Sequence, residues 1–414
     1  MDPIPILFLV SSIILLGFAA SVLFKKTGLP DILVLIILGM IFGPGLHILH
    51  EDIVCAIIEP VGALAIAVIL FDSGLRLNLK EILKESPRAL ATAFLWFIAS
   101  VFIVGYLLHY LTNMDLGPGL YLGASIGGLS APVALGVLRK DIVPESIRTR
   151  VVIESIVSDV ICIVFAMAIL DSILMGYTNP RTVSGMILAK VSTGLVIGAL
   201  IGVVWLLIII RLHRIFGEVE YEYMATIGLA ILSYTIAEFS QASGGIAALA
   251  FGLTISNRWI FEPIVDFSQY EKLFERVNSF LKRFSNEVSF FMKALFFTQF
   301  GMMYMFTDWI SMYLGLLLVA YLMAARYIIT FFTMHDKPGY TLLVGSMVGK
   351  GLAAAVLIQL PLAMGLEWGR TVFSIGVNAI LFSLIITTIA MFILQRGKST
   401  GQVVMNVEVE GYRE

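Results

Sequence analysis

The chain has 414 residues, of which 59% are apolar and only 14% are charged, and its mean hydropathy is +0.96. Soluble domains carry roughly 25% charged residues, so this chain lacks the polar surface that a water-soluble protein needs. A formal net charge of −2 without a basic block disfavours nucleic-acid partners, and Cys55 and Cys162 both lie in apolar segments, which excludes a disulfide-stapled secreted protein. We predict an all-α polytopic membrane protein.

Runs of apolar residues long enough to cross a bilayer follow one another along the chain, and they predict about thirteen transmembrane helices. In chain order the predicted spans are 4–24, 30–46, 53–72, 89–111, 118–138, 148–170, 185–210, 223–239, 243–257, 287–306, 309–333, 340–363 and 371–395. Asp2 precedes the first span, and Lys25 and Lys26 follow it, which is the reverse of the charge order in a secretory signal peptide. We therefore expect the first span to stay in the protein.

The Lys and Arg residues of the loops indicate how the spans are oriented. Most of the 27 fall in loops on one side of the predicted membrane, whereas only Arg181 and Arg370 fall in loops on the other side. The positive-inside rule makes the rich side cytoplasmic, which predicts a multi-pass plasma-membrane protein with its N-terminus outside and its C-terminus in the cytoplasm. A cytoplasmic amphipathic helix is expected over 258–286, where aromatic residues are interspersed with charges, and a short cytoplasmic tail over 396–414.

The span 148–170 carries two carboxylates, Glu154 and Asp159, and Asp159 lies near the predicted bilayer midplane. Ser155 and Asp159 are one turn apart on one face, Glu154 and Ser158 share another, and the two carboxylates point about 140° apart. Acids at this depth are costly, which predicts two roles: one carboxylate exchanges ions in a cavity, and the other is held in an ion pair. The alternative is that helix partners neutralise both acids and nothing more.

Two spans, 118–138 and 340–363, are interrupted by glycine or proline near the middle of the membrane. The residues concerned are Gly123, Gly127, Gly128 and Pro132 in the first span, and Gly345, Gly349 and Gly351 in the second. Backbone groups freed at such depth must line a cavity or find partners. Interrupted helices at corresponding places of two halves indicate an inverted-repeat transporter, in which the first six spans match the last six. Close packing of glycine-rich helices is the alternative for either span alone.

Four basic residues fall within predicted spans, namely Lys190, Lys293, Arg326 and Lys350. A charge at membrane depth is costly unless it is paired or wetted, so each is a functional candidate. Lys190 and Lys293 lie about six residues from a helix end, where a long side chain reaches the interface, and snorkelling is the simpler interpretation for these two.

Several of these motifs resemble the monovalent cation/proton antiporters of the sodium/proton exchanger family, particularly its archaeal and bacterial NhaP-type members. The resemblance extends over essentially all the predicted spans. The matching segments are FDSGL (71–75), IESIVSDVICIVF (153–165), SGGIAALAFGLTISN (243–257), NEVSFFMKALFFTQFG (286–301), AARYIITFF (324–332) and VGKGLAAAVL (348–357). Two positions depart from the family pattern: its Asn-Asp pair is Ser158-Asp159 here, and its Thr-Asp-Pro is Ser130-Ala131-Pro132.

The resemblance implies that Asp159 is the carrier, which binds either a proton or a cation. Sodium is a hard ion that oxygen atoms satisfy, and we expect Ser155, Ser130 and backbone carbonyls of the interrupted helix to supply them. The resemblance also implies a structural ion pair between Glu154 and Arg326. Only one carboxylate then exchanges ions, which favours electroneutral one-for-one exchange.

Three further residues are candidates near the site. Asp72, at the cytoplasmic end of its span, either lines the funnel that concentrates cations or is an ordinary interfacial carboxylate. Ser158 and Lys350 belong to the expected helix crossing, where Lys350 matches a basic residue of the family. The acidic residue that would balance this charge is replaced by Ala131, which leaves the ion preference open.

The family pattern also divides the chain. It implies an ion-binding core of 89–170 and 309–395, scaffold and dimerisation helices at 1–75 and 223–306, a linking helix at 185–210, and a homodimer. We predict a secondary active Na⁺ (or Li⁺)/H⁺ antiporter that works without a cofactor in a lipid bilayer.

A K⁺/H⁺ antiporter or potassium efflux transporter of the same fold is the alternative function, because positions 158 and 131 are altered. The sequence has no G-x-G-x-x-G nucleotide-binding domain, which weighs against a ligand-gated efflux system. An enzyme is disfavoured by the lack of a His-rich metal motif or a protease signature. A channel would show repeated pore helices, whereas this chain has two interrupted helices that meet at acidic residues.

Overall fold

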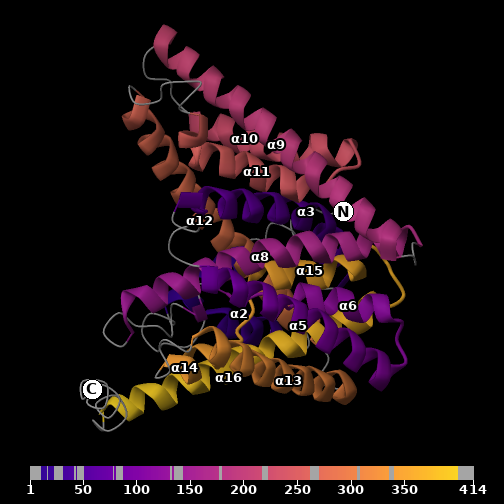
Figure 1. The fold of residues 1–414 in the computed structure, drawn as a ribbon. Helices are drawn as coiled ribbons and strands as arrows, with labels where there is room; N and C mark the ends of the chain where they lie inside the picture. Colours follow the sequence, from indigo (N-terminus) through magenta and orange to yellow (C-terminus); the bar gives the residue numbers. More distant parts are fainter. Residues whose placement is uncertain are drawn as a thin grey trace. The chain divides into compact units, whose positions relative to one another are not determined.

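The fold is nearly all helical, and the part of the chain that the structure describes contains no strand (Figure 1). This computed structural model describes residues 11–15, 17–22, 31–41, 43, 51–77, 79–80, 87–130, 133–134, 143–176, 180–216, 222–261, 270–304, 308–334 and 340–399. Its elements are α2 (Asp31–Met40), α3 (Glu51–Arg76), α5 (Pro87–Thr112), α6 (Leu116–Ser125), α8 (Glu145–Leu174), α9 (Pro180–Phe216), α10 (Glu222–Phe239), α11 (Gly244–Ser256), η2 (Arg258–Phe261), α12 (Glu271–Met302), α13 (Trp309–Thr333), α14 (Thr341–Gly345), α15 (Leu352–Ala363) and α16 (Gly369–Ser399).

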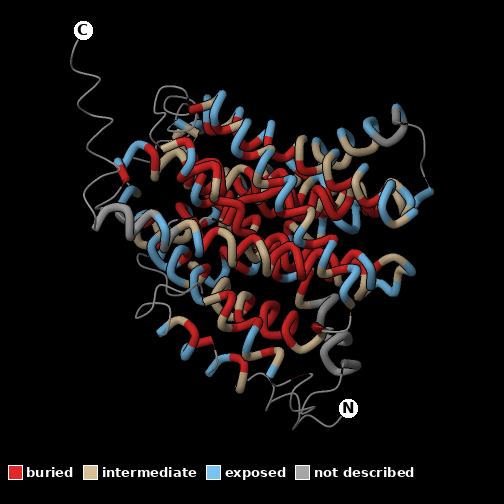
Figure 2. Tube along the Cα trace, turned by 90° about the horizontal axis from the view of Figure 1, so that it is seen from below, coloured by how far each residue is buried: buried red, intermediate tan, exposed pale blue. Residues whose placement is uncertain are grey.

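Five of the described helices are long and apolar enough to cross a membrane. They are Pro87–Thr112, Glu145–Leu174, Ser184–Phe216, Trp309–Thr333 and Gly369–Ala390. Large apolar side chains on their outer faces are exposed, as at Leu188 of α9 and Phe332 of α13. Figure 2 shows buried and exposed positions alternating along single helices. Apolar side chains on the outer face suit contact with lipid, and the prediction of an all-α polytopic membrane protein is confirmed.

The two interrupted spans are broken where glycine predicts. Helix α6 ends at Ser125, and residues 127–130 are not helical; the second break separates α14 from α15. A Cβ atom at Gly128 would lie 3.3 Å from Asp159 Oδ1, and one at Gly351 would lie 2.9 Å from Ser130 Oγ. Glycine at these positions therefore lets the two breaks approach their neighbours. Residues 131 and 132 lie outside the described residues.

Helix α12 differs from its prediction. The sequence indicated a helix over 258–286 and a separate span over 287–306, but one continuous helix runs over Glu271–Met302. Neither glycine nor proline occurs in it before Gly301, so the change from charged to apolar composition does not interrupt the backbone. The first half of α12 buries Phe274 and Leu281 in a core cluster with α9 and α11, so this face contacts protein.

The chain forms two compact units. Unit 1 comprises Met1–Ala56, Ser86–Cys162 and Lys293–Glu414, and unit 2 comprises Ile57–Glu85 and Ile163–Met292. Unit 1 contains both interrupted helices and the first half of α8. In unit 2, α9 packs on α11 so closely that a Cβ atom at Gly198 would lie 2.0 Å from the carbonyl oxygen of Ala247. The assignment of core and scaffold roles to these segments stays a prediction.

A proline sits inside the second interrupted helix without leaving its carbonyl partner free. Pro361 of α15 has no N–H, so the carbonyl of Leu357, four residues earlier, loses its regular helical donor. The hydroxyl of Tyr121, on α6, donates a hydrogen bond to that carbonyl. Both residues are buried in unit 1. A side chain from one interrupted helix thus completes the backbone of the other.

Candidate functional site

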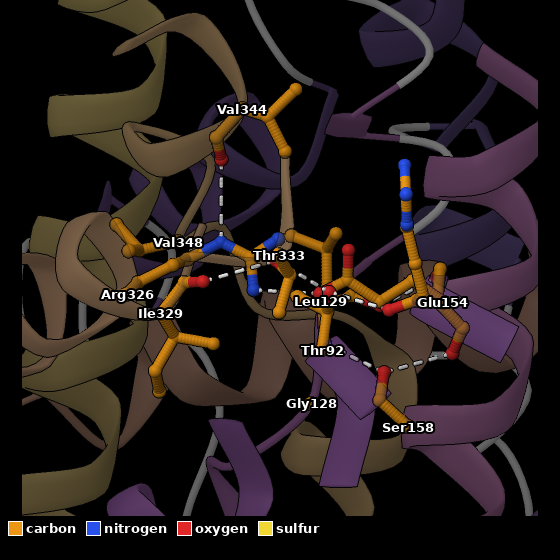
Figure 3. Close-up of polar contacts among 12 residues, drawn as sticks. Thr92, Gly128, Leu129, Glu154, Ser158, Arg326, Ile329, Thr333, Val344 and Val348 are labelled. Carbon is orange, nitrogen blue, oxygen red and sulfur yellow. Dashed lines mark hydrogen bonds and ion pairs between the residues drawn. The ribbon is translucent and has the colours of Figure 1, made fainter. Parts of the chain in front are cut away.

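Two serines of α8 hold the first break in place, and Figure 3 labels one of them, Ser158. The hydroxyl of Ser155 donates to the carbonyl of Leu129 at 2.6 Å. Ser158 Oγ accepts the backbone N–H of Leu129 at 3.1 Å and donates to the carbonyl of Ser155 at 2.9 Å. Both serines are buried, and together they satisfy the two backbone groups of Leu129. The non-helical segment is therefore anchored directly to the helix that carries Asp159.

The two breaks meet backbone to backbone. The N–H of Ser130 donates to the carbonyl of Gly349 at 3.0 Å. Hydroxyls of α16 serve the second break: Thr387 accepts the N–H of Val348 and Ser383 accepts the N–H of Lys350, each at 3.3 Å. These bonds replace helical ones at a depth where water is scarce, which is the condition for a broken helix inside a membrane.

Asp159 forms no hydrogen bond or ion pair with any residue that the structure describes, and it remains partly exposed. Its carboxylate lies against the backbone of Gly128, as the 3.3 Å from a hypothetical Cβ to Oδ1 shows. Cys162 Sγ and Ser158 Oγ, both on α8, lie 3.3 Å and 3.7 Å from the same Cβ position. A carboxylate that no described residue holds in a direct ion pair can bind either a proton or a monovalent cation.

Glu154 and Arg326 form a buried ion pair, with Glu154 Oε1 and Arg326 Nη1 2.8 Å apart (Figure 3). Their side chains are 2% and 0% exposed, so neither charge reaches water. Arg326 Nε also donates to the carbonyl of Val344 at 3.3 Å, which ties α13 to α14. The two residues expected to pair are therefore in contact, and the pair joins α8 to α13.

Lys350 lies at the crossing, where it is 1% exposed. Its Nζ donates to the carbonyl of Gly128 at 3.1 Å and lies 5.0 Å from the ring centroid of Trp96. Ser130 is also buried at the crossing. The structure thus brings Ser155, Ser158, Asp159, Ser130 and Lys350 together around the two breaks.

Asp72 belongs to unit 2, whereas the residues just described belong to unit 1. Its Oδ2 accepts a hydrogen bond from Arg76 Nε at 2.8 Å, and Arg76 also donates to Asn286 at 2.7 Å. The other oxygen, Oδ1, is buried without a partner. The proposed funnel role of Asp72 stays a prediction.

The two remaining lysines within spans lie beside carboxylates. Lys190 Nζ is 2.6 Å from Asp171 Oδ2 in unit 2, and Lys293 pairs with Asp31 in unit 1. Each of the four side chains is less than one third exposed. Ion pairing and partial exposure both lower the free-energy cost of placing these charges in a membrane span. Snorkelling is therefore not the only way in which the two lysines are accommodated.

Sequence reasoning missed Trp96 and the hydroxyls of α16. Ser383 and Thr387 are one turn apart in a mostly apolar stretch of α16, and this spacing is a signal that could have identified them. Trp96 gives no such signal, because tryptophan in a membrane helix is equally typical of packing against lipid.

Curated relatives share part of the chain at low identity. The probable Na⁺/H⁺ antiporter 2 of Methanocaldococcus jannaschii is 25% identical over 67% of this chain. The K⁺/H⁺ antiporter NhaP2 of a Shewanella species is 27% identical over 62%, and the Na⁺/H⁺ antiporter NhaH of Halobacillus dabanensis is 24% identical over 59%. The matches span 64%, 45% and 63% of these relatives, which is less than two thirds of each.

Solved structures share the fold. The sodium proton antiporter MjNhaP1 of Methanocaldococcus jannaschii at pH 8 matches with a TM-score of 0.73 and 21% identity, over 94% of this chain and 99% of that one. An electron-microscopy structure of MjNhaP1 matches with a TM-score of 0.69 and 18% identity over the whole of both chains. The family model for the transmembrane part of sodium/hydrogen exchangers matches residues 10–396. The chain therefore belongs to the sodium/hydrogen exchanger family of membrane transporters.

Proposed function

We propose that this protein is a secondary active antiporter that exchanges Na⁺ or Li⁺ for H⁺ at Asp159. One observation carries the proposal: Asp159 has no hydrogen-bond or ion-pair partner among the described residues, although it stands beside a broken helix. Proton and cation compete for this carboxylate, so each is released when the other binds. Competition for one site couples the two fluxes without a second device.

Oxygen atoms at the two breaks are suited to replace the hydration shell of a sodium ion at Asp159. Ser155 uses its hydroxyl hydrogen on Leu129, which leaves its lone pairs free to bind a cation. Ser130 is buried at the crossing, and the carbonyl of Gly128 already accepts a hydrogen bond from Lys350. We expect Ser155 and Ser130 to be ligands, with backbone carbonyls of the break completing the site.

The buried pair of Glu154 and Arg326 supports one-for-one exchange. The pair is neutral as a whole, so Asp159 alone changes its charge when it binds a proton or Na⁺. Both loaded forms then carry the same charge across the membrane. An extra proton on Lys350 in each cycle would make the exchange electrogenic instead.

The loop charges and the family support a proposal for the arrangement in the cell. We propose a plasma-membrane homodimer with its N-terminus outside, because Lys and Arg gather in the loops of one side. Residues 89–170 and 309–395 would form the moving core, and 1–75 and 223–306 the dimerising scaffold. Helix α9 would link the two halves of the chain.

Exchange of K⁺ for H⁺ is the second candidate. It is favoured by the similarity to a K⁺/H⁺ antiporter and by the altered residues Ser158 and Ala131. Everted membrane vesicles with a pH-sensitive dye distinguish the two when they are challenged in turn with Na⁺, Li⁺ and K⁺. A response to K⁺ alone would favour the second candidate.

The test of the site is the variant Asp159→Asn in proteoliposomes. It should insert and fold but lose Na⁺-dependent proton movement, because an amide neither titrates nor offers a charge to the cation. Glu145→Gln is a matched control on the same helix, where the carboxylate is exposed at 79% and pairs with Arg148. Substantial exchange by purified Asp159→Asn would remove Asp159 from the carrier role.

A further inference from the structure

The buried ammonium of Lys350 forms no direct ion pair with a described carboxylate, although Asp159 lies near enough to attract it. No salt bridge joins Lys350 to any residue that the structure describes, including Asp159 on the neighbouring helix α8. Its only hydrogen bond from Nζ within that part of the chain goes to the carbonyl of Gly128. A cation that is 1% exposed and feels the attraction of Asp159 only without a direct ion pair carries a large desolvation cost. Something else near Lys350 must offset that cost.

The indole of Trp96, on α5, occupies the required place. Lys350 Nζ lies 5.0 Å from the ring centroid, within the roughly 6 Å over which an aromatic face attracts a cation. The guanidinium carbon of Arg326 lies 5.2 Å from the same centroid, so one ring serves both buried cations. Cation–π attraction is strongest for tryptophan and for desolvated cations, and Trp96 is 0% exposed.

The N–H group of the Trp96 indole forms no hydrogen bond within the described part of the chain. Trp96 Nε1 is buried without a hydrogen-bond partner there, which costs free energy. By contrast Trp205, the buried tryptophan of α9, donates its Nε1–H to Thr226. A leucine at position 96 would avoid the cost of the orphaned N–H, but it would offer no π face to the cations. The presence of tryptophan therefore points to its π face.

We propose that Trp96 is a positioning residue that holds the Lys350 ammonium over its ring and away from Asp159. The ring attracts the Lys350 ammonium in place of a paired carboxylate. The Asp159 carboxylate therefore stays without a direct ion pair. A lysine released from this position would compete with the transported cation for the Asp159 carboxylate. The proposal rests on the proposed exchange at Asp159 and identifies what sets the cation affinity of that site.

The test is a double-variant comparison of Trp96→Leu and Lys350→Met, with Trp96→Phe as the conservative variant. Two quantities are measured for each purified protein: the Tm in detergent, and the Na⁺ concentration that gives half-maximal exchange in proteoliposomes. Trp96→Leu should raise that concentration on the order of tenfold, because a desolvated cation–π contact is lost. In the Lys350→Met background the same change should have little effect. Trp96→Phe should stay near the original protein in both quantities.

The matched control is Trp205→Leu, which removes a buried indole far along the sequence and outside unit 1. Its effect on Tm should be the same with and without Lys350→Met. Equal losses from Trp96→Leu in both backgrounds, or a Trp96→Phe protein as impaired as Trp96→Leu, would overturn the proposal. Non-additive Tm values without any change in the Na⁺ concentration for half-maximal exchange would also overturn the proposal. If the original protein exchanges no cation, the proposed function fails, and additive Tm values would then also reject the contact.

Discussion

Removing the arginine of the Glu154–Arg326 pair should destabilise the protein more than removing the glutamate. Arg326→Gln leaves Glu154 buried, and Arg326 is the only partner of that carboxylate among the described residues. Glu154→Gln leaves Arg326 charged, but Arg326 keeps the carbonyl of Val344 and the ring of Trp96. The stranded arginine is therefore partly compensated, and the stranded glutamate is not.

The size of the difference follows from these contacts. Breaking a buried ion pair by removing one partner costs about 3–5 kcal/mol, because the other charge stays uncompensated. A hydrogen bond to a charged group contributes about 1.5–3 kcal/mol, and Arg326 loses its bond to Val344 only in its own variant. We expect Arg326→Gln to cost about 1–3 kcal/mol more than Glu154→Gln. The double variant should recover part of the loss, since neither charge is then stranded.

Thermal unfolding of the purified proteins in detergent measures this cycle, with surviving monodisperse protein after heating as the signal. Glu145→Gln is the control, because its exposed pair with Arg148 contributes little to stability. Strictly additive losses in the double variant would show that Glu154 and Arg326 do not interact. A Glu154→Gln protein less stable than Arg326→Gln would refute the argument from Val344 and Trp96.

Three other outcomes are expected. Ser158→Ala should lower Tm, because the N–H of Leu129 loses its buried acceptor at a cost of about 1–3 kcal/mol; an unchanged Tm in detergent would show that the break is held by other bonds. Gly198→Leu should abolish folded protein in size-exclusion chromatography, since its Cβ would meet Ala247, whereas Gly185→Ala, with open space around it, should be tolerated. Exchange in proteoliposomes clamped with K⁺ and valinomycin should be the same at 0 and about −100 mV, where each transported net charge would be worth about 2.3 kcal/mol; a steady current would exclude one-for-one exchange.

The sequence anticipates residues that are chemically out of place in a membrane. Glu154, Asp159 and Arg326 stand out because a charge within an apolar run has few structural explanations. The breaks stand out for a similar reason, since Gly128 and Gly349 interrupt helices that composition alone would continue. These features are local in the sequence, and the structure places them together as the family pattern implies.

Features that depend on partners distant in the sequence are less accessible. Trp96 looks like any aromatic residue of a membrane helix, and only the approach of Lys350 and Arg326 reveals its role. The sequence did not predict that α12 is continuous, because its composition changes from charged to apolar although no helix breaker marks a boundary. The hydroxyl of Ser155 was expected to face a cation, and it also bonds to Leu129, a contact between helices that spacing cannot supply.

The hydrogen bond from Tyr121 to the carbonyl that Pro361 leaves free makes two sites in the chain evolutionarily interdependent. Neither helix requires its residue for its own backbone. The proline removes the hydrogen-bond donor of the Leu357 carbonyl, and the tyrosine hydroxyl replaces that donor. A lineage that first replaced Pro361 by alanine would restore a regular helical bond to Leu357, after which phenylalanine at position 121 would carry no penalty. The reverse order would pass through a protein with an orphaned carbonyl. Among relatives of this chain, substitutions at the two positions should therefore covary, with the proline lost before the hydroxyl.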